Sequence, residues 1–251
     1  MDIDIDIDMD RLEHFLPKIA MLPPVGSLRR GDLLTSDFLL EQKGDLEIYY
    51  APHNEYINTV AKICVLGITP GWSQMELAFR QVRDDLRAGA YTVQEMERRA
   101  KATAGLAGSM RVHLCEMLDE LGVQEWLGIS TTRKLFSERR DLIHTTSLIR
   151  NPVFWKGSNY TGHTPKITAS PLLCTYAYEG FPSEWKQLQD PILIPLGKSV
   201  ADTLAPLVEQ GAIDRARCLL GFPHPSGANG HRKKQFAEVR ENLINQVRSL
   251  G

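Results

Sequence analysis

One short loop near the end of the chain holds the residue types best suited to chemistry. It reads Gly-Phe-Pro-His-Pro-Ser-Gly-Ala-Asn-Gly over residues 221–230, and its His224 lies between two prolines that restrain the backbone and aim the imidazole. Ser226, Gly227 and the neighbouring amides can approach a phosphate closely. The basic triplet at 232–234 follows where the last helix should begin, a position that also favours anions. The loop as a whole predicts an anion-binding site, although the triplet alone is more typical of a solvated surface.

A second turn, Gly67-Ile68-Thr69-Pro70-Gly71, follows directly after the buried apolar run 63–66. A strand-to-helix turn with two glycines can cradle a phosphate. Its spacing matches neither the dinucleotide-binding nor the Walker pattern, and no lysine follows in the required place. Taken by itself, this turn is weak evidence for any particular ligand.

Both turns fall where an alternation of strands and helices would place a ligand. Apolar periodicity predicts strands at 63–66, 142–149, 192–194 and 218–222, and helices at 12–19, 75–86, 110–121, 199–210 and 233–250. Residues 25–60 show only loops and short pieces. Strands separated by helices indicate an α/β fold with a mostly parallel, helix-covered sheet. Such sheets bind ligands outside the carboxyl ends of their strands, where both turns and the polar end of the second strand are expected.

The composition favours one domain without a membrane segment. The chain has 251 residues, 43% of them hydrophobic, and a net charge of −2, which excludes a polycationic nucleic-acid binder but allows a local basic groove. Residues 1–10 alternate aspartate with apolar residues and are expected to form a disordered acidic tail rather than an edge strand, leaving 11–251 as the domain. The four cysteines form no Cys-x-x-Cys pair and are expected to be reduced, mostly buried thiols. No stretch has the pattern of a signal peptide or a membrane span, so the expected compartment is the cytoplasm.

Five segments, in their order along the chain, together resemble the uracil-DNA glycosylase superfamily over roughly residues 61–235. The turn at 67–71 is similar to its first active-site motif. His224-Pro225-Ser226-Gly227-Ala228-Asn229 is similar to its second motif, in the form found in the single-strand-selective monofunctional branch. The other three segments resemble the strand that reads the base, the strand–turn–helix segment between the motifs, and the Gly-x-x-Gly helix start of the thermostable bacterial branch. They are, respectively, Thr145–Pro152, Pro195–Ser199 and Gly105–Met110.

This resemblance implies a three-layer α/β/α sandwich with a central, mostly parallel four-stranded sheet. It also implies a monofunctional DNA glycosylase of base-excision repair. Such an enzyme flips uracil, or a related deaminated base, out of the helix and hydrolyses its N-glycosidic bond. No metal or other cofactor is implied. The expected partner is uracil-containing or abasic DNA, single- or double-stranded, bound by a monomer.

The resemblance also assigns roles to residues. His224 would donate a hydrogen bond to the carbonyl oxygen on which the anion of the leaving base develops, and Thr69 would orient the attacking water. The base pocket would be formed by Gly67, Ile68, Pro70, Gly71, Phe79, Ser147 and Asn151. The DNA contacts would come from Ser226, Gly227, Asn229, His231, Arg232 and Lys233.

Two polar positions depart from the pattern of the superfamily. Thr69 stands where efficient members carry Asp or Asn, and a threonine hydroxyl can orient water but is a poor base. The same hydroxyl has a structural alternative, which is to bond the backbone of the turn. Ser147 stands where an asparagine reads the base, which leaves Asn151 or Asn159 to substitute.

Other differences concern stacking and the mechanism. The segment before Gly105 lacks the aromatic residue that stacks on the base, so Phe79 or Trp72 would take that role, although Phe79 also fits an apolar core stripe of its helix. The iron–sulfur cysteines of the thermostable branch are missing as well. Neither motif contains a lysine, which argues against a Schiff-base lyase because that chemistry requires a positioned amine.

Two further functions fit the same residues. A non-catalytic or slow-turnover binder of uracil-containing or abasic DNA is favoured by Thr69 and Ser147. A hydrolase or transferase of free nucleosides or nucleotides could use the same turns, but the cations at 232–234 weigh against it.

Overall fold

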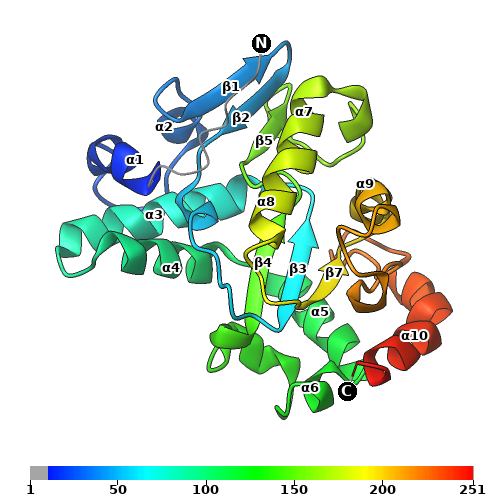
Figure 1. The fold of residues 1–251 in the computed structure, drawn as a ribbon. Coiled ribbons are helices and arrows are strands. Elements are labelled where there is room, and N and C mark those ends of the chain that lie inside the picture. Colours follow the sequence, from blue (N-terminus) through cyan, green and yellow to red (C-terminus); the bar gives the residue numbers. More distant parts are fainter. Residues whose placement is uncertain (1–10, 251) are drawn as a thin grey trace.

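Residues 11–250 are described by a computed structural model, drawn in Figure 1. The acidic segment 1–10, expected to be a tail, and Gly251 lie outside the described residues. The described part is a mixed α/β structure with one parallel and one antiparallel sheet (Figure 1).

The parallel sheet carries the two turns singled out from the sequence. Its strands lie in the order β4, β3, β7, with the bounds Ile143–Ser147, Ile63–Gly67 and Ile192–Pro195. Ile63 of β3 is in register with Ile143 of β4 and with Ile192 of β7, so the three carboxyl ends meet at one edge. The expected α/β fold with a parallel sheet is confirmed at this level.

The fourth strand, expected at 218–222, is reduced to a single parallel bridge between Leu193 and Cys218. The chain turns immediately afterwards, because the amide of Leu220 donates to the carbonyl of Cys218 at 2.8 Å and the amide of Phe222 to that of Leu219 at 3.3 Å. These local bonds withdraw the backbone from the ladder. The apolar run 218–222 is therefore packed beside β7 without forming a strand of its own.

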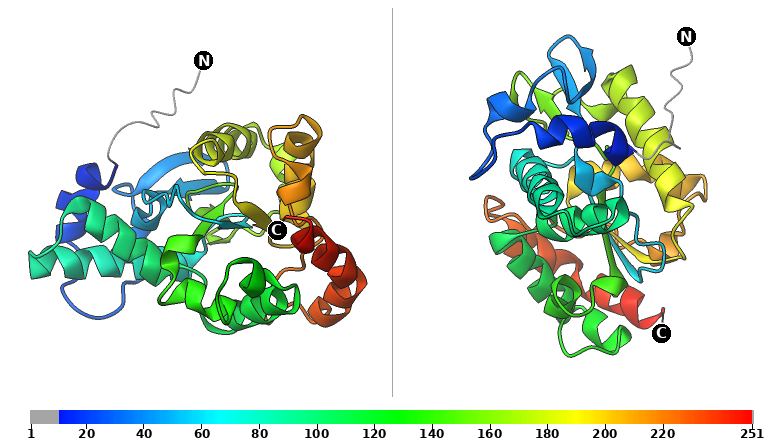
Figure 2. Two further views of the ribbon diagram at one scale, coloured as in Figure 1. Left: turned by 60° about the horizontal axis from the view of Figure 1, so that its bottom comes forward. Right: turned by 90° about the vertical axis from the view of Figure 1, so that its left-hand side faces the viewer.

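Alternate residues of β3 point into two hydrophobic clusters, one on each face of the sheet. Cys64 and Leu66 pack with residues of α7, α8 and α9, which have the bounds Pro171–Thr175, Phe181–Trp185 and Lys198–Glu209. Ile63 and Val65 pack with residues of α5 and α10, which have the bounds Gly108–Glu120 and Arg232–Arg248. In the left view of Figure 2 the strands lie between these two groups of helices.

A second, antiparallel sheet was not expected from the sequence. Its strands lie in the order β1, β2, β5, β6, with the bounds Leu39–Lys43, Leu46–Tyr49, Val153–Trp155 and Ser158–Asn159. The segment 25–60 therefore contains two strands as well as loops. They are short, β1 is interrupted by an irregularity after Leu39, and β2 finds its partner β5 about a hundred residues along the chain. Local periodicity carries little of this information.

The pair α3 (Trp72–Ala88) and α4 (Val93–Ala104) packs beside this second sheet in a third hydrophobic cluster. Helix α4 was also missed, although Thr92 and Glu95 form a reciprocal capping box at its start. The remaining helical elements are α1 (Arg11–Ala20), α2 (Arg30–Leu33), η1 (Pro52–Asn54), α6 (Val123–Trp126), η2 (Thr132–Phe136), η3 (Arg140–Leu142), η4 (Ile167–Ala169), η5 (Tyr176–Gly180) and η6 (Arg215–Arg217).

The cysteines match the expectation of mostly buried thiols. Cys64, Cys115 and Cys218 are buried thiols, and Cys174 is half-buried. Among the helices of residues 11–250, none combines the length and the apolar character needed to cross a membrane.

Candidate functional site

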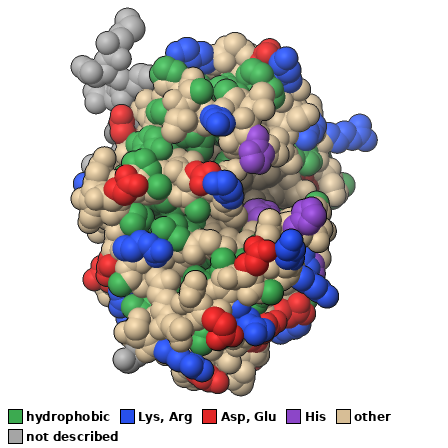
Figure 3. All heavy atoms as spheres, turned by 90° about the vertical axis from the view of Figure 1, so that its right-hand side faces the viewer, with side chains coloured by type: hydrophobic (Ala, Val, Ile, Leu, Met, Phe, Trp, Pro, Cys, Tyr) green, Lys and Arg blue, Asp and Glu red, His purple; other side chains and the backbone are tan. Residues whose placement is uncertain are grey.

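A cavity of about 710 Å³ opens at the carboxyl ends of the three parallel strands. The turn 67–71 after β3, Ser147 at the end of β4 and Leu196 after β7 all line it. His224 reaches the same cavity from the loop that follows the bridged segment. The two turns singled out from the sequence are thus brought together. Figure 3 shows the face over α9 and α10, which is hollowed next to a group of histidine side chains.

Most of the expected site residues line this cavity, and six do not. Those that line it are Gly67, Ile68, Thr69, Pro70, Gly71, Ser147, His224, Ser226 and Asn229. Those that do not are Phe79, Asn151, Gly227, His231, Arg232 and Lys233.

His224 is held as a neutral hydrogen-bond donor. Burial lowers the pKa of its imidazole. The backbone amide of Ser226 donates to its Nδ1 at 3.2 Å, so the proton of the neutral ring lies on Nε2. The loop is fixed from outside by His113 of α5, whose Nδ1 donates to the carbonyl of Pro225 at 3.0 Å. Asn229 fixes it from inside by donating to the carbonyl of His224 at 3.1 Å.

Gly197, at the N-cap of α9, determines how closely the His224 loop approaches the sheet. Its backbone has φ +85° and ψ 172°, a conformation that residues with a side chain scarcely adopt. Its amide donates to the carbonyl of Phe222 at 3.0 Å, and a Cβ placed on it would lie 3.0 Å from the Cβ of His224. The position of His224 therefore depends on a glycine in a different element.

Thr69 is bound to the backbone of the neighbouring segment rather than directed at a reactant. Its hydroxyl donates to the carbonyl of Asn151 at 2.8 Å and accepts from the amide of Val153 at 3.0 Å. These two bonds tie the turn 67–71 to the start of β5. The single proton of the hydroxyl is committed to Asn151, so the structural alternative is the one that the geometry favours.

Two residues expected to bind the base are placed elsewhere. Phe79 is fully buried in the third cluster, with its ring 4.7 Å from that of Phe38 and 6.0 Å from that of Tyr50. The apolar stripe of α3 faces α1 and β2 rather than the cavity, so the expectation that Phe79 stacks on a base is wrong. Asn151 is also buried outside the cavity lining, and its contribution is the carbonyl that holds Thr69.

The residues expected to contact DNA divide into two groups. Ser226 and Asn229 brace the loop: the Ser226 hydroxyl accepts from the amide of Ala228 at 3.1 Å, and Asn229 also donates to Gln235 at 2.9 Å. Arg232 donates to the carbonyl of Ser226 at 2.9 Å. The side chains of His231 and Lys233, together with Gly227, lie on the exposed surface beyond the cavity.

The cavity wall carries cations and imidazoles, and two helices begin there. Helices α3 and α9 both begin at the cavity, where the positive ends of their dipoles favour negative charge. Lys101, His53 and His163 line it along with His224 and Lys198, and no aspartate or glutamate does so among the described residues. Lys198 is mostly solvated and paired with Asp202 at 2.8 Å. The wall suits an anionic or oxygen-rich ligand.

Several lining residues were not singled out from the sequence. His53 and Asn54 come from η1, and Lys101 comes from α4, the helix that the periodicity did not reveal. Asn159, considered as a substitute reader of the base, caps α3: its Oδ1 accepts from the amide of Trp72 at 3.0 Å. No local pattern distinguishes these residues, since only the pairing of distant segments places them at the cavity.

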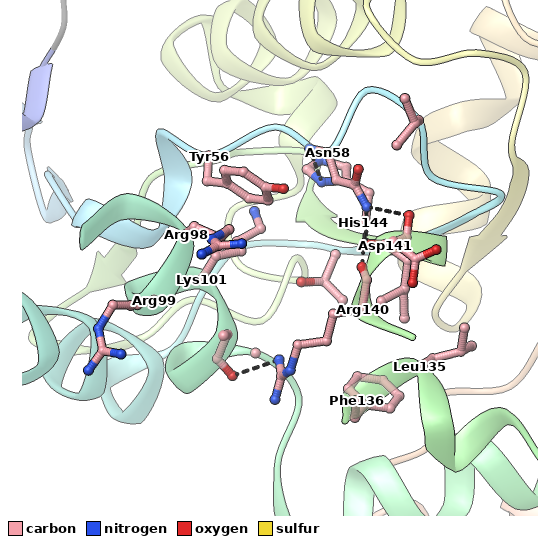
Figure 4. A pocket seen from close by; sticks show the side chains of 15 residues that line it. Tyr56, Asn58, Arg98, Arg99, Lys101, Leu135, Phe136, Arg140, Asp141 and His144 are labelled. Atoms are coloured by element: carbon pink, nitrogen blue, oxygen red, sulfur yellow. Dashed lines mark hydrogen bonds between the residues drawn. The ribbon is translucent and has the colours of Figure 1, made fainter. Parts of the chain in front are cut away.

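A second cavity of about 410 Å³ adjoins the first and shares Lys101, Gly105 and Thr145 with it. Figure 4 shows Arg98, Lys101 and Arg140 among the side chains around it, together with Tyr56. Its acidic residue, Asp141, is already paired with Arg139 at 3.1 Å. The cationic lining therefore continues from one cavity into the next.

A buried network lies behind His144, which lines the second cavity. Glu184 of α8 accepts from Nε2 of His144 at 2.6 Å and pairs with Arg150 at 2.8 Å. Burial alone would raise the pKa of Glu184, but the bond from His144 and the charge of Arg150 lower it to about 2. The backbone amide of Asn58 donates to Nδ1 of His144 at 3.4 Å. This bond fits a neutral imidazole, and burial lowers the pKa of His144. The network joins β4 to α8.

Comparison with known proteins places the chain beside one curated relative. No model of a protein family matches the chain. It is 46% identical over 246 residues to a Bacillus subtilis (strain 168) protein named "Uncharacterized protein YoxB", an alignment that covers 98% of this chain and 95% of the relative.

The close approach at Gly197 predicts the effect of a single methyl group. Gly197→Ala should lower the free energy of unfolding by about 1–3 kcal/mol, because an alanine would be strained in this backbone conformation. The added methyl group should also displace His224. Urea unfolding and the NMR resonances of the His224 ring measure the two effects. Gly211→Ala is the matched control, since Gly211 has φ +73° with nothing near the added carbon. Unmoved His224 resonances in Gly197→Ala contradict the geometry.

The buried imidazoles predict that acid destabilises the fold before carboxylates titrate. Burial lowers the pKa of His53 to about 3 and also lowers those of His144 and His224, whereas an unfolded imidazole titrates near 6.5. The unfolded chain then binds more protons, so stability is complete above about pH 6.5 and falls as the pH drops. Each imidazole contributes up to about 1.4 kcal/mol per pH unit.

Urea midpoints measured between pH 7 and pH 5 test this dependence. His53→Gln should weaken the dependence of the urea midpoint on pH. His14→Gln, a change on the exposed face of α1, should leave that dependence unchanged. A wild-type midpoint that stays constant over this range is the contrary result.

Proposed function

This chain belongs to the same family as YoxB, and we propose that it is a monofunctional DNA glycosylase that excises uracil or a related deaminated base. The proposal carries with it the fold of the uracil-DNA glycosylase superfamily, a three-layer α/β/α sandwich with a four-stranded central sheet. In that fold, the segment bridged at Cys218 would correspond to the fourth strand.

The observation that carries the proposal is the meeting of the two motif-like turns with a neutral His224 in one cavity. The cavity of about 710 Å³ lies within the usual range for small-ligand sites and would receive a single flipped nucleotide. His224 Nε2 has no hydrogen-bond partner among residues 11–250 and is free to donate to a base carbonyl. A donor aimed at developing charge in such a site typically contributes about 3–4 kcal/mol to the transition state.

Stabilisation of the departing base is the chemistry that this wall supports best. As the N-glycosidic bond breaks, the sugar gains oxocarbenium character and its electron pair leaves with the base as an anion. The helix N-termini and cations of the wall would stabilise that anion together with His224. Water then adds to C1′ and releases its proton to solvent.

A slow-turnover binder of uracil-containing or abasic DNA is the second candidate. It is favoured by one specific observation, the commitment of the Thr69 hydroxyl to Asn151 and Val153. With no carboxylate among the described residues of the lining, water would attack without a strong base. Binding would then exceed turnover.

Excision and binding are separated by an assay on oligonucleotides that contain one uracil. Incubation followed by alkali and a denaturing gel should give strand scission, because alkali cleaves the abasic product. His224→Ala should reduce the rate by about 10²–10³-fold through loss of the donor. His14→Ala on α1 is the matched control and should retain the wild-type rate.

The other outcomes of this assay distinguish the two proposals and the role of His224. Retarded mobility on a native gel without scission supports the binder. Neither scission nor retardation, on single- or double-stranded DNA containing uracil or hypoxanthine, overturns both proposals. Scission that survives in His224→Ala overturns the role of His224.

The second cavity predicts where the DNA backbone runs. Arg98 and Arg140 line it next to Lys101, and phosphates flanking the flipped nucleotide would bind there. Arg98→Ala with Arg140→Ala should weaken DNA binding and reduce the slope of log K against log salt by about 2. Fluorescence anisotropy at several salt concentrations measures both quantities. Arg87→Ala, at the exposed end of α3, should change neither, and an unchanged slope in the double variant excludes this path.

A further inference from the structure

Two polar side chains at the cavity wall are buried with atoms left unpaired. His53 and Asn54 of η1 are only 4% and 7% exposed. Nδ1 of His53 and Nδ2 of Asn54 have no hydrogen-bond partner among the described residues, yet both side chains line the cavity. Buried polar groups in folded proteins are nearly always hydrogen-bonded. A pair left unsatisfied at a cavity is therefore placed to meet a ligand.

A third polar group joins them from α4, which packs against η1. Lys101 is half-buried and lines both cavities, and its ammonium makes no hydrogen bond or ion pair within residues 11–250. In Figure 4 its side chain projects from α4 toward the second cavity near Arg98. Burial lowers the pKa of Lys101 to about 8, against the opposing charge of Glu184. With a pKa of about 8, the Lys101 side chain titrates just above neutral pH, and no carboxylate forms an ion pair with it within residues 11–250.

These three residues lie across the cavity from His224. The carbonyl of Asn54 accepts from Arg150, which follows β4 at one edge of the parallel sheet. The His224 loop follows the segment bridged to β7 at the other edge. A planar ring in the cavity would present one edge to His224 and the opposite edge to η1 and α4.

We propose that Asn54, His53 and Lys101 form the wall that reads the keto edge of the flipped base, in place of the amide that Ser147 lacks. The proposal rests on the proposed function in taking the ligand to be a nucleobase. A lactam edge offers a carbonyl oxygen next to an N–H group, as in uracil and hypoxanthine. The Asn54 amide and the Lys101 ammonium donate to that oxygen, and the neutral ring of His53 accepts from the N–H.

The same wall rejects an amino base. Cytosine places an amino group where uracil has its carbonyl oxygen, so N–H groups would face the ammonium and the amide. Buried donors would then remain unpaired, which is how sites built around hydrogen bonds discriminate strongly. Ser147, with a single hydroxyl that both donates and accepts, cannot supply this selectivity by itself.

Equilibrium binding of free uracil and free cytosine to the full-length protein tests the wall without requiring turnover. Wild type should prefer uracil, and Asn54→Ala and Lys101→Met should each weaken uracil binding about tenfold or more with little change for cytosine. Asn54→Asp replaces the donor with an acceptor and should reduce or reverse the preference. Lys101→Arg should retain it, and Asn242→Ala, on the exposed face of α10, is the matched control.

The glycosylase assay on uracil- and cytosine-containing DNA, run with the same variants, separates this inference from the proposed function. Uracil binding that depends on Asn54 without scission by wild type supports the wall and overturns the enzyme. Scission with an unchanged uracil-to-cytosine preference in Asn54→Ala and Lys101→Met supports the enzyme and overturns the wall. A wild-type protein that binds neither base overturns the wall. Melting curves establish that each variant is folded. If Asn54→Ala does not fold, the ratio of uracil affinity to cytosine affinity in Lys101→Met, which leaves Asn54 in place, decides the question.

Discussion

β3 runs parallel between β4 and β7, and this shared register places every element of the candidate site. Because the carboxyl ends of three strands coincide, the turn 67–71, Ser147 and Leu196 lie at one edge, and α3 and α9 begin there. The residues of β3 are apolar on both faces, so the strand is stabilised by two clusters of packed helices. A shift of one residue would exchange these faces and misplace the turn. The cavity is in this sense a consequence of how the sheet is packed.

The polar contacts around this edge reinforce the arrangement from different sides. Thr69 ties the first turn to β5, Gly197 lets the His224 loop lie against α9, and Glu184 joins β4 to α8. All of these contacts link segments that are separated in sequence. They restrict the cavity to one shape, and a preorganised shape is what permits fixed donors to act without reorganisation. Nδ2 of Asn54, whose side chain lines the same cavity, has no hydrogen-bond partner within residues 11–250.

Much of the parallel sheet and of the two turns could be predicted from sequence, because buried strands and glycine turns leave a local record. The run 63–66 followed by Gly67 is such a record, as is His224 between two prolines. The second sheet and η1 could not be predicted, since β2 pairs with β5 about a hundred residues further along the chain and no local pattern records that pairing. Phe79 shows the limit most clearly: its helical spacing identified an apolar stripe but not the surface that the stripe covers. Asn54 and Lys101 line the cavity because of the packing of η1 and α4, which the sequence did not predict.

The described lining of the cavity holds no carboxylate. The rate of base excision at such a site would therefore depend on groups other than a general base. With Thr69 committed to the backbone, little remains to activate water, and the burden falls on stabilising the departing anion. His224 supplies one donor from the β7 side, held neutral by burial and by the amide of Ser226. A cationic wall on the β4 side would act on the other edge of the same ring. A base that leaves as an anion would be stabilised from both edges, whereas an amino base such as cytosine would lose the stabilisation that the wall supplies. Selectivity and rate would then depend on the same charge distribution, so that weakening the wall lowers both together.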